Sequence, residues 1–145
     1  MMTYKEPEKM STQTIVIETP KWSFVKRNEH GKVDYVSPIP SPFWYGRLDG
    51  FAGGDGDPMD CIWLGCPPQG NMAEGQVIGV VRFVDGGACD DKWLLSDTQA
   101  ISTWQKKKLT IFFSFYAVLK NGLVLLRDRA INSRLDTIEF WVDVQ

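Results

Sequence analysis

The sequence is poor in histidine and cysteine, with one histidine, His30, and three cysteines among 145 residues. The cysteines are odd in number and lack the Cys-x-x-Cys spacing, so the sequence favours neither a disulfide framework nor a zinc site. His30 lies in a polar run that is typical of a hairpin tip, and no Gly-x-Ser-x-Gly motif accompanies it. Serine-hydrolase chemistry is therefore disfavoured.

Long hydrophobic runs and an excess of basic charge are also absent. No run is long enough to span a membrane, and no apolar segment follows the polar first residues as in a signal peptide, so we expect a cytoplasmic protein with no membrane partner. The formal net charge of −2 provides no basic field, and nucleic acid is not expected as a partner. The length suits one domain over residues 1–145, with residues 1–12 as a loose N-terminal arm.

One short stretch concentrates acidic residues: Asp55-Gly56-Asp57-Pro58-Met59-Asp60-Cys61 places three carboxylates within six residues. Gly56 and Pro58 favour a tight turn, because glycine reaches backbone angles that other residues avoid and proline fixes its own φ. Carboxylates held this close repel one another unless a cation, basic residues or water neutralises them. The stretch indicates a cation-binding turn, and a solvated turn is the alternative because Asp, Gly and Pro are common loop residues.

Acidic residues recur where predicted strands end. The runs that read as strands are 14–18, a hairpin of 22–25 and 32–36, then 61–65, 76–84 and 93–95. Acids stand at strand ends or turns at Glu18, Asp55, Asp57, Asp60, Asp85 and Asp90. All-oxygen ligand sets suit hard cations, above all Mg²⁺ and Mn²⁺. A calcium-binding EF-hand that begins at Asp55 is excluded, because its twelfth position is Cys66 and not Glu.

A long helix is predicted in the second half of the chain, over residues 96–119. The apolar side chains expected on its core-facing side are Ile101, Trp104, Phe112, Phe115 and Leu119. Residues 123–126 read as a further strand, and Ser133 with Asp136 resembles the capping box of a short C-terminal helix. Short strands with a helix across them predict an α+β, mainly β fold built on a small closed barrel.

The acidic stretch satisfies the full signature of family I soluble inorganic pyrophosphatases, and its flanks resemble that family over about residues 14–120. The strand that ends at Asp85 and the Asp90-x-Lys92 element lie in matching register. The resemblance implies a five-stranded OB-like barrel crossed by a helix, dependence on Mg²⁺ or Mn²⁺, and hydrolysis of pyrophosphate to two phosphates. It also implies a homo-oligomer, since bacterial relatives are commonly hexamers.

Roles follow from the resemblance residue by residue. The carboxylates that match metal ligands are Asp55, Asp60, Asp85, Asp90 and Glu18. Asp57 is similar to the general base that orients a water bridging two metals. The side chains that match phosphate-binding residues are Lys26, Tyr45, Lys92 and Tyr116. The residues alone leave two of these roles open, because Lys92 can simply pair with Asp90 or Asp91 and Tyr116 can serve helix packing.

The sequence departs from the family pattern on the phosphate side. The four departures are Asn28 for an acid, Tyr35 for an arginine, Ser41 for a tyrosine and Ala117 for a lysine. Loss of one electrostatic contact to a developing charge costs on the order of 10²- to 10³-fold in rate. Arg47, next to Tyr45-Gly46, is a candidate replacement cation.

Three functions are consistent with this pattern. The favoured one is a divergent, metal-dependent pyrophosphatase, because the metal-binding carboxylates and the matching base are all present. The second is a catalytically weak or inactive relative that binds metal and a phosphorylated ligand, because two cations are missing. The third is a nucleic-acid binder that stacks bases on Trp22, Trp44 and Trp63, which the overall acidity makes the weakest.

Overall fold

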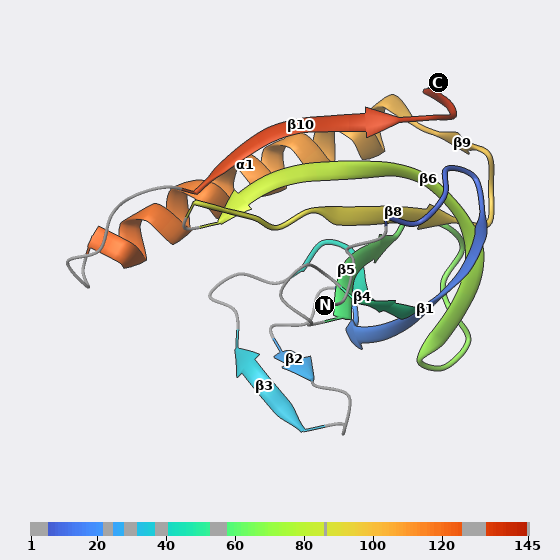
Figure 1. Cartoon of the computed structure of the whole chain (residues 1–145), viewed down its shortest axis with the longest axis horizontal. Helices are drawn as coiled ribbons and strands as arrows, with labels where there is room; N and C mark the ends of the chain where they lie inside the picture. Colours follow the sequence, from blue (N-terminus) through green and yellow to red (C-terminus); the bar gives the residue numbers. More distant parts are fainter. Residues whose placement is uncertain are drawn as a thin grey trace.

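The fold is organised around β6 (Met72–Asp85), a strand of 14 residues that curves along the other strands (Figure 1). The other barrel strands are β1 (Thr12–Thr19), β4 (Trp44–Ala52), β5 (Pro58–Trp63) and β8 (Lys92–Ser96). Neighbouring strands follow the order β1–β4–β5–β8–β6, and β6 also pairs with β1, so the sheet closes on itself. Only the β5–β8 pair is parallel among these contacts. The expected mainly β fold with a five-stranded closed barrel is confirmed.

In this computed structural model the described residues are 6–21, 25–27, 32–36, 41–52, 58–85, 87–125 and 133–144, and only the backbone is described for 25–27, 33–36, 49–52, 58 and 122–125. The remaining strands are β2 (Val25–Arg27), β3 (Val33–Val36), β7 (Ala88–Cys89), β9 (Ala100–Ile101), β10 (Arg134–Phe140) and β11 (Asp143–Val144). β2 and β3 pair antiparallel, which confirms the predicted hairpin, and β10 continues the sheet beyond β6.

Two apolar cores lie on the two faces of the barrel wall. The first fills the barrel and draws residues from all five of its strands, with Ile15, Leu48, Cys61, Val80 and Trp93 at most 1% exposed. The second lies between the barrel and the helix and includes Ile62, Phe83 and Leu94 together with Leu109 and Phe113. Because side chains alternate along a strand, Cys61 and Trp93 point into the barrel while Ile62 and Leu94 point towards the helix.

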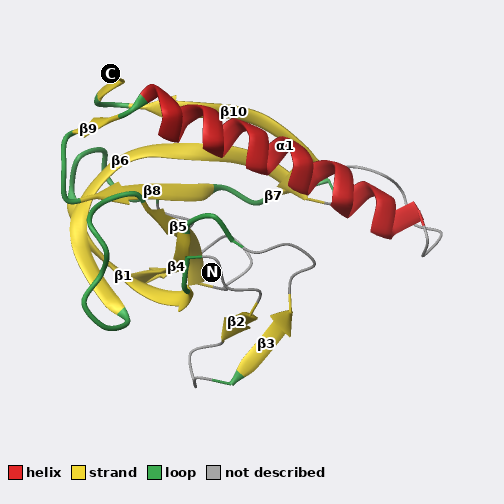
Figure 2. Ribbon diagram, turned by 180° about the vertical axis from the view of Figure 1, so that it is seen from behind, coloured by secondary structure: helices red, strands yellow, loops and turns green. Residues whose placement is uncertain are grey.

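Helix α1 (Thr103–Leu125) extends beside β10 and the outer face of the barrel (Figure 2). Its first turn is closed by a reciprocal capping box, since the backbone N–H of Gln105 donates to Ser102 Oγ at 3.1 Å and that of Ser102 donates to Gln105 Oε1 at 3.2 Å. The predicted start near residue 96 is wrong because residues 92–96 continue β8. The predicted strand at 123–126 is also wrong, because the helix continues to Leu125.

The buried side of α1 agrees with the predicted one only in part, because Ile101 is buried before the helix and Phe112 packs against the core. Leu109, Phe113 and Ala117 face the core, whereas Trp104 is 65% and Phe115 50% exposed. The helix carries no acidic residue and is apolar on more than one side, so spacing alone does not select a single buried stripe. Among the described residues, no helix is both long and apolar enough to cross a membrane.

The predicted short C-terminal helix is wrong, because residues 134–140 form strand β10 against β6. The register between these strands shifts between Leu135 and Thr137. This irregularity interrupts the two-residue alternation of a strand, so that Leu135 and Ile138 fall three residues apart, a spacing that also suits a helix.

The N-terminal segment is also better anchored than predicted. Pro7 is buried, and the backbone N–H of Met10 donates to the carbonyl of Val77 at 2.8 Å. Gln76 Nε2 in turn donates to the carbonyl of Met10 at 3.3 Å. Met10 is therefore attached to β6 by hydrogen bonds, and residues 1–5 lie outside the described ranges.

Candidate functional site

Lys92 and Asp60 meet on the helix-facing side of the barrel wall because of the parallel register of β5 and β8. Cys61 lies opposite Trp93 in that register, and both side chains fill the barrel. The preceding residues, Asp60 and Lys92, therefore point to the outer face. The Lys92 ammonium donates to Asp60 Oδ2 at 2.8 Å.

The Lys92 ammonium bridges two carboxylates. It lies 2.7 Å from Asp90 Oδ2 as well as 2.8 Å from Asp60 Oδ2, and the Lys92 side chain is only 5% exposed. Burial alone would lower the pKa of Lys92, but the negative charges of Asp60 and Asp90 outweigh it and raise that pKa. The site thus combines a charged lysine with two carboxylates whose mutual repulsion it relieves.

Tyr45 completes this group from β4. The Lys92 ammonium lies 5.9 Å from the centre of the Tyr45 ring. Tyr45 is half-buried as a residue, but its hydroxyl end is enclosed, and this burial raises the pKa of Tyr45 well above its ordinary value. The negative charges of Asp60 and Asp90 and a hydrogen bond to Asp60 raise the pKa further. The hydroxyl therefore stays protonated and able to donate near neutral pH.

A close approach of β4 to β1 fixes Tyr45 in place. A Cβ atom on the following residue, Gly46, would collide with the backbone carbonyl of Val16. Only glycine lets β4 and β1 come this near. Tyr45 therefore supplies the aromatic ring, and Gly46 allows the close packing that positions it.

Asp90 and Asp91 are adjacent but serve opposite faces of the sheet. The backbone N–H of Asp90 donates to the carbonyl of Phe83 at 2.8 Å, and the backbone N–H of Phe83 donates to Asp91 Oδ1 at 3.4 Å. Both backbone polar groups of Phe83 therefore hold this pair of residues. Asp90 contacts Lys92, while Asp91 accepts from Arg82 at 2.7 Å.

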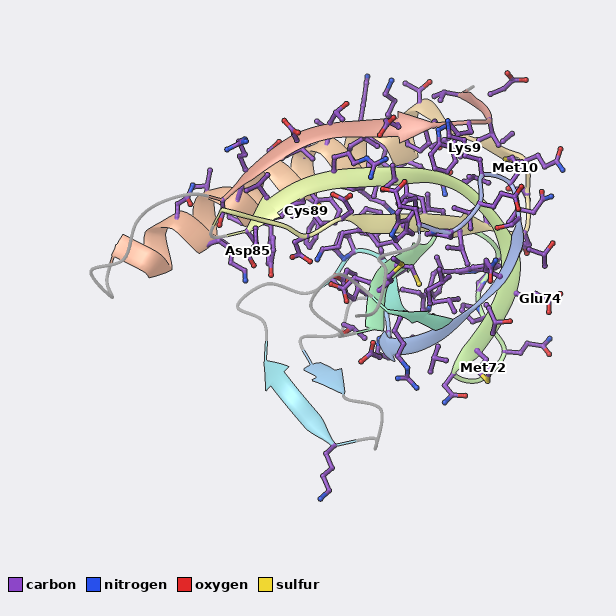
Figure 3. All side chains as sticks on the ribbon, viewed as in Figure 1. Lys9, Met10, Met72, Glu74, Asp85 and Cys89 are labelled. Carbon is purple, nitrogen blue, oxygen red and sulfur yellow. The ribbon has the colours of Figure 1, made fainter. Side chains whose placement is uncertain are left out.

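Asp85 ends β6 at the C-terminal half of the helix, at the end of the strand remote from Met72 and Glu74 (Figure 3). Its Oδ2 lies 3.0 Å from the Lys120 ammonium, and its Oδ1 accepts from Ser133 Oγ at 3.1 Å. Asn121 fixes Ser133 by two hydrogen bonds, from Nδ2 to the Ser133 carbonyl and from the Ser133 N–H to Oδ1. The predicted site acid is thus held by residues that sequence reasoning did not assign to the site.

Tyr116 lies beside the pair formed by Asp85 and Lys120. Its ring packs against Phe83 at 5.8 Å and Phe112 at 6.0 Å, and the Lys120 ammonium lies 5.4 Å from its centre. Tyr116 and Tyr45 pack against the same apolar core, and Tyr116 makes a small contribution to the raised pKa of Tyr45. Ala117, where the family pattern has lysine, is 7% exposed in the apolar core, so this helix position presents no cation to the site.

Glu18 lies in β1, half-buried, and its charge contributes to raising the pKa of the buried Cys61 thiol after burial itself and Asp60. The predicted residues Asp55 and Asp57 lie outside the described ranges, and for Lys26 only the backbone of β2 is described. The predicted roles of these residues therefore stay predictions. The structural effect of Asn28 and Tyr35, where the family pattern has an acid and an arginine, also stays untested.

The described part of the site fits a hard divalent cation in chemistry. Within the described ranges, no group of three or more His, Cys, Asp or Glu side chains is placed to hold a metal. Asp60 and Asp90 nevertheless converge on one ammonium, so two carboxylates already share one cation. Carboxylate oxygens are the ligands that Mg²⁺ and Mn²⁺ prefer. The pair supplies part of such a ligand set.

The sequence predicts one of two further cations of this region, Arg47, but not the other, Lys120. Lys120 was missed because its partner Asp85 is far away in the chain, although its spacing of four residues from Tyr116 places both on one side of the helix. Arg47, the candidate replacement cation, lies opposite Asp60 in the β4–β5 register, so both side chains project from one face. Ser41 instead closes a local turn through its hydroxyl, which donates to the carbonyl of Phe43 at 2.7 Å.

Two solved structures with a similar fold are titled inorganic pyrophosphatases. The protein from Coxiella burnetii superposes with a TM-score of 0.68 at 20% sequence identity, covering 92% of this chain and 89% of that one. The protein from Helicobacter pylori gives a TM-score of 0.67 at 21% identity, covering 93% and 90%. At these identities the likeness defines the class of fold: a mainly β barrel with one helix packed on it.

The sequence comparison narrows the class to a family. The profile of the family described as inorganic pyrophosphatase matches residues 15–124. A curated inorganic pyrophosphatase from Corynebacterium efficiens is 31% identical, with 74% of this chain and 80% of the relative covered. This chain belongs to the inorganic pyrophosphatase family, which confirms the resemblance seen in the acidic stretch.

Proposed function

We propose that this protein hydrolyses inorganic pyrophosphate to two phosphates with the help of Mg²⁺ or Mn²⁺. The observation that carries the proposal is the buried Lys92 shared by Asp60 and Asp90, next to the enclosed hydroxyl of Tyr45. The site offers carboxylates for a divalent cation and donors for phosphate oxygens within one small region. Membership of the family supports the same reaction.

The proposed roles divide the site into a metal half and a phosphate half. The metal half consists of Asp55, Asp60, Asp85, Asp90 and Glu18, and the phosphate half of Lys26, Tyr45, Lys92 and Tyr116. Divalent cations bound there would neutralise phosphate charge and lower the pKa of the attacking water. Asp57 orients that water and accepts its proton, while the lysines and tyrosines hold the phosphate oxygens. Positioning and charge neutralisation are the main tasks in phosphoryl transfer.

A weak or inactive phosphate-binding protein is the second candidate. The observation in its favour is Ala117, which is buried among apolar side chains where the family pattern has a lysine. A site with fewer cations still binds a metal and a phosphorylated ligand, but it stabilises the developing charge less. The two candidates differ in turnover and not in binding.

The test is phosphate release from pyrophosphate with Mg²⁺ or Mn²⁺, in the wild type, Asp57→Asn and Asp136→Asn. Asp136 is exposed on β10, so Asp136→Asn makes the same chemical change away from the site. Loss of a general base lowers the rate by on the order of 10²- to 10⁴-fold, and we expect this only for Asp57→Asn. Calorimetry with Mn²⁺ checks that the metal still binds. Equal rates for the wild type and Asp57→Asn would remove the catalytic assignment, and metal binding without turnover in the wild type would favour the second candidate.

We also propose that the protein is a homo-oligomer that uses the exposed side of α1. Trp104, Ile111, Phe115 and Val118 project from the helix with exposures of 65%, 64%, 50% and 65%. In an antiparallel pair of helices centred on Ile111, Trp104 would meet Val118 of a second copy and the lysines at 106–108 would avoid their counterparts. Sedimentation of Ile111→Glu tests this, because a mass equal to that of the wild type would contradict it.

A further inference from the structure

Lys120 is a cation of the site region with one carboxylate partner. Its ammonium lies 3.0 Å from Asp85 Oδ2, and the side chains of Lys120 and Asp85 are 34% and 32% exposed. Lys92, by contrast, is 5% exposed and contacts two carboxylates. Lys120 is therefore bound less tightly by carboxylates than Lys92 and is more accessible to solvent. Of the two lysines, it is the one that can exchange its carboxylate partner for another ligand.

Asp85 stays in position when Lys120 leaves it. Its other oxygen, Oδ1, accepts from Ser133 Oγ at 3.1 Å, and Asn121 holds Ser133 at the start of β10 through two hydrogen bonds. The carboxylate is thus fixed from the side opposite Lys120. The oxygen that Lys120 contacts is the one that a stronger cation would take.

Tyr116 would keep the released ammonium near the site. The Lys120 ammonium lies 5.4 Å from the centre of the Tyr116 ring, within the range of a cation–π contact. Tyr116 in turn packs against the same apolar core as Tyr45, whose hydroxyl bonds to Asp60. A lysine on a flexible four-carbon stem can therefore turn from Asp85 towards the space between the two acidic groups.

We propose that Lys120 is an exchangeable phosphate-binding residue. It pairs with Asp85 while that carboxylate is free of metal. When a divalent cation binds Asp85, Lys120 is released and donates to a phosphate oxygen of pyrophosphate. The exchange is favourable because a divalent cation attracts the carboxylate more strongly than an ammonium does, and because the phosphate offers Lys120 a dense negative charge. This inference rests on the proposed function for the identity of the ligand.

The proposal predicts opposite changes in two binding constants. In Lys120→Met, the competitor for Asp85 is gone, so Mn²⁺ should bind about two- to fivefold more tightly in the absence of phosphate. The same variant should bind methylenediphosphonate, a non-hydrolysable pyrophosphate analogue, about 10- to 100-fold more weakly in the presence of Mg²⁺. A purely structural role for Lys120 would weaken both.

The experiment is calorimetric titration of the wild type, Lys120→Met, Lys120→Arg and Lys107→Met. Lys107 is an exposed lysine on the same helix, and its variant should bind both ligands as the wild type does. Lys120→Arg keeps the charge and should recover most of the analogue affinity. Unchanged constants in Lys120→Met, or a parallel loss of both, would overturn the proposal.

The readouts separate this proposal from the proposed function. Neither titration requires turnover, so a wild type that binds the analogue without hydrolysing pyrophosphate would remove the catalytic function and leave the role of Lys120 standing. A wild type that binds no analogue would overturn the role of Lys120. If the wild type is active and Lys120→Met binds metal and analogue as the wild type does, the proposed role of Lys120 is wrong and the proposed function stands.

Discussion

Two cations, Lys92 and Arg82, occupy opposite faces of the same pair of strands, β6 and β8. Lys92 lies on the helix-facing side beside Tyr45. The Arg82 guanidinium lies 5.5 Å from the centre of the Trp93 ring, which belongs to the core inside the barrel. Each cation gathers carboxylates, and the neighbours Asp90 and Asp91 divide between them.

By number of acids alone, the Arg82 side would be the better candidate for a metal. Arg82 contacts Glu6, Asp91 and Glu139 at 3.0, 2.7 and 2.8 Å, whereas Lys92 contacts two carboxylates. Burial opposes protonation of Arg82, but hydrogen bonds to these acids raise its pKa, so the guanidinium remains charged and occupies the point where the oxygens converge. Glu6 and Glu139 are also 47% and 42% exposed. The two groups therefore differ in the burial of their cation, because the side chain of Lys92 is 5% exposed and that of Arg82 is 27% exposed.

The strongest test of this contrast is Lys92→Met in metal-free protein. Removing the ammonium leaves Asp60 and Asp90, which are 22% and 34% exposed, facing each other without a cation. Breaking a buried ion pair on one side costs about 3 kcal/mol or more, and partial exposure of the partners places the expected loss at the low end. Urea denaturation in a chelator should show this loss of unfolding free energy. Added Mg²⁺ should restore more stability to the variant than to the wild type, because the vacated space suits a cation. An unfolding midpoint of Lys92→Met equal to that of the wild type would contradict the prediction that Lys92 stabilises Asp60 and Asp90.

The sequence predicted the barrel better than its boundaries because buried strands carry local signals. Residues 61–64 of the apolar run predicted at 61–65 are buried, as expected for a strand covered on both faces, although the strand itself ends at Trp63. The error at β10 has a local cause, since the register shift between Leu135 and Thr137 breaks the alternation that identifies a strand. The true helix start was recognisable from Ser102 and Gln105, whose spacing is that of a capping box.

For the site, the sequence predicted the identity of residues better than their contacts. The sequence predicts a phosphate-binding role for Lys92, with a pair to Asp90 or Asp91 as the alternative, and the structure shows ion pairs with Asp90 and Asp60. Asp60 lies 32 positions away in the chain, and only the parallel register of β5 and β8 brings it to Lys92. The contact of Lys120 with Asp85 was not predicted for the same reason, because no local sequence pattern links a helix residue to the end of β6. Contacts that depend on tertiary pairing have no signal in a single sequence.

The second test removes the cation on the other face, with Arg82→Met. We expect a loss of about 2 kcal/mol in unfolding free energy at low salt, since hydrogen bonds to charged groups are worth more than neutral ones but Glu6 and Glu139 are partly solvated. High salt should reduce this loss, because exposed charges are screened, and should change the Lys92→Met loss much less. Glu6→Gln is the matched control and should have the smaller effect of an exposed partner. If the loss of unfolding free energy in Arg82→Met did not depend on salt, the Arg82 and Lys92 groups would not differ in solvent screening as proposed.

The smallest test uses alkaline pH and Tyr45. Burial, assisted by Asp60 and Asp90, holds the pKa of Tyr45 well above the ordinary value of 10.0, so above that pH the unfolded chain releases a proton that the folded chain retains. Stability is therefore complete below pH 10 and falls as the pH rises towards the folded-state pKa, by about 1 kcal/mol per pH unit. Tyr45→Phe should remove this contribution, so its unfolding free energy measured in a chelator should decline less steeply with pH than that of the wild type. Arg82→Met should decline as steeply as the wild type, because guanidinium does not titrate in this range. Parallel curves for Tyr45→Phe and the wild type would show that the Tyr45 hydroxyl is not enclosed by the acidic group, and the contrast between the two faces would then rest on Lys92 alone.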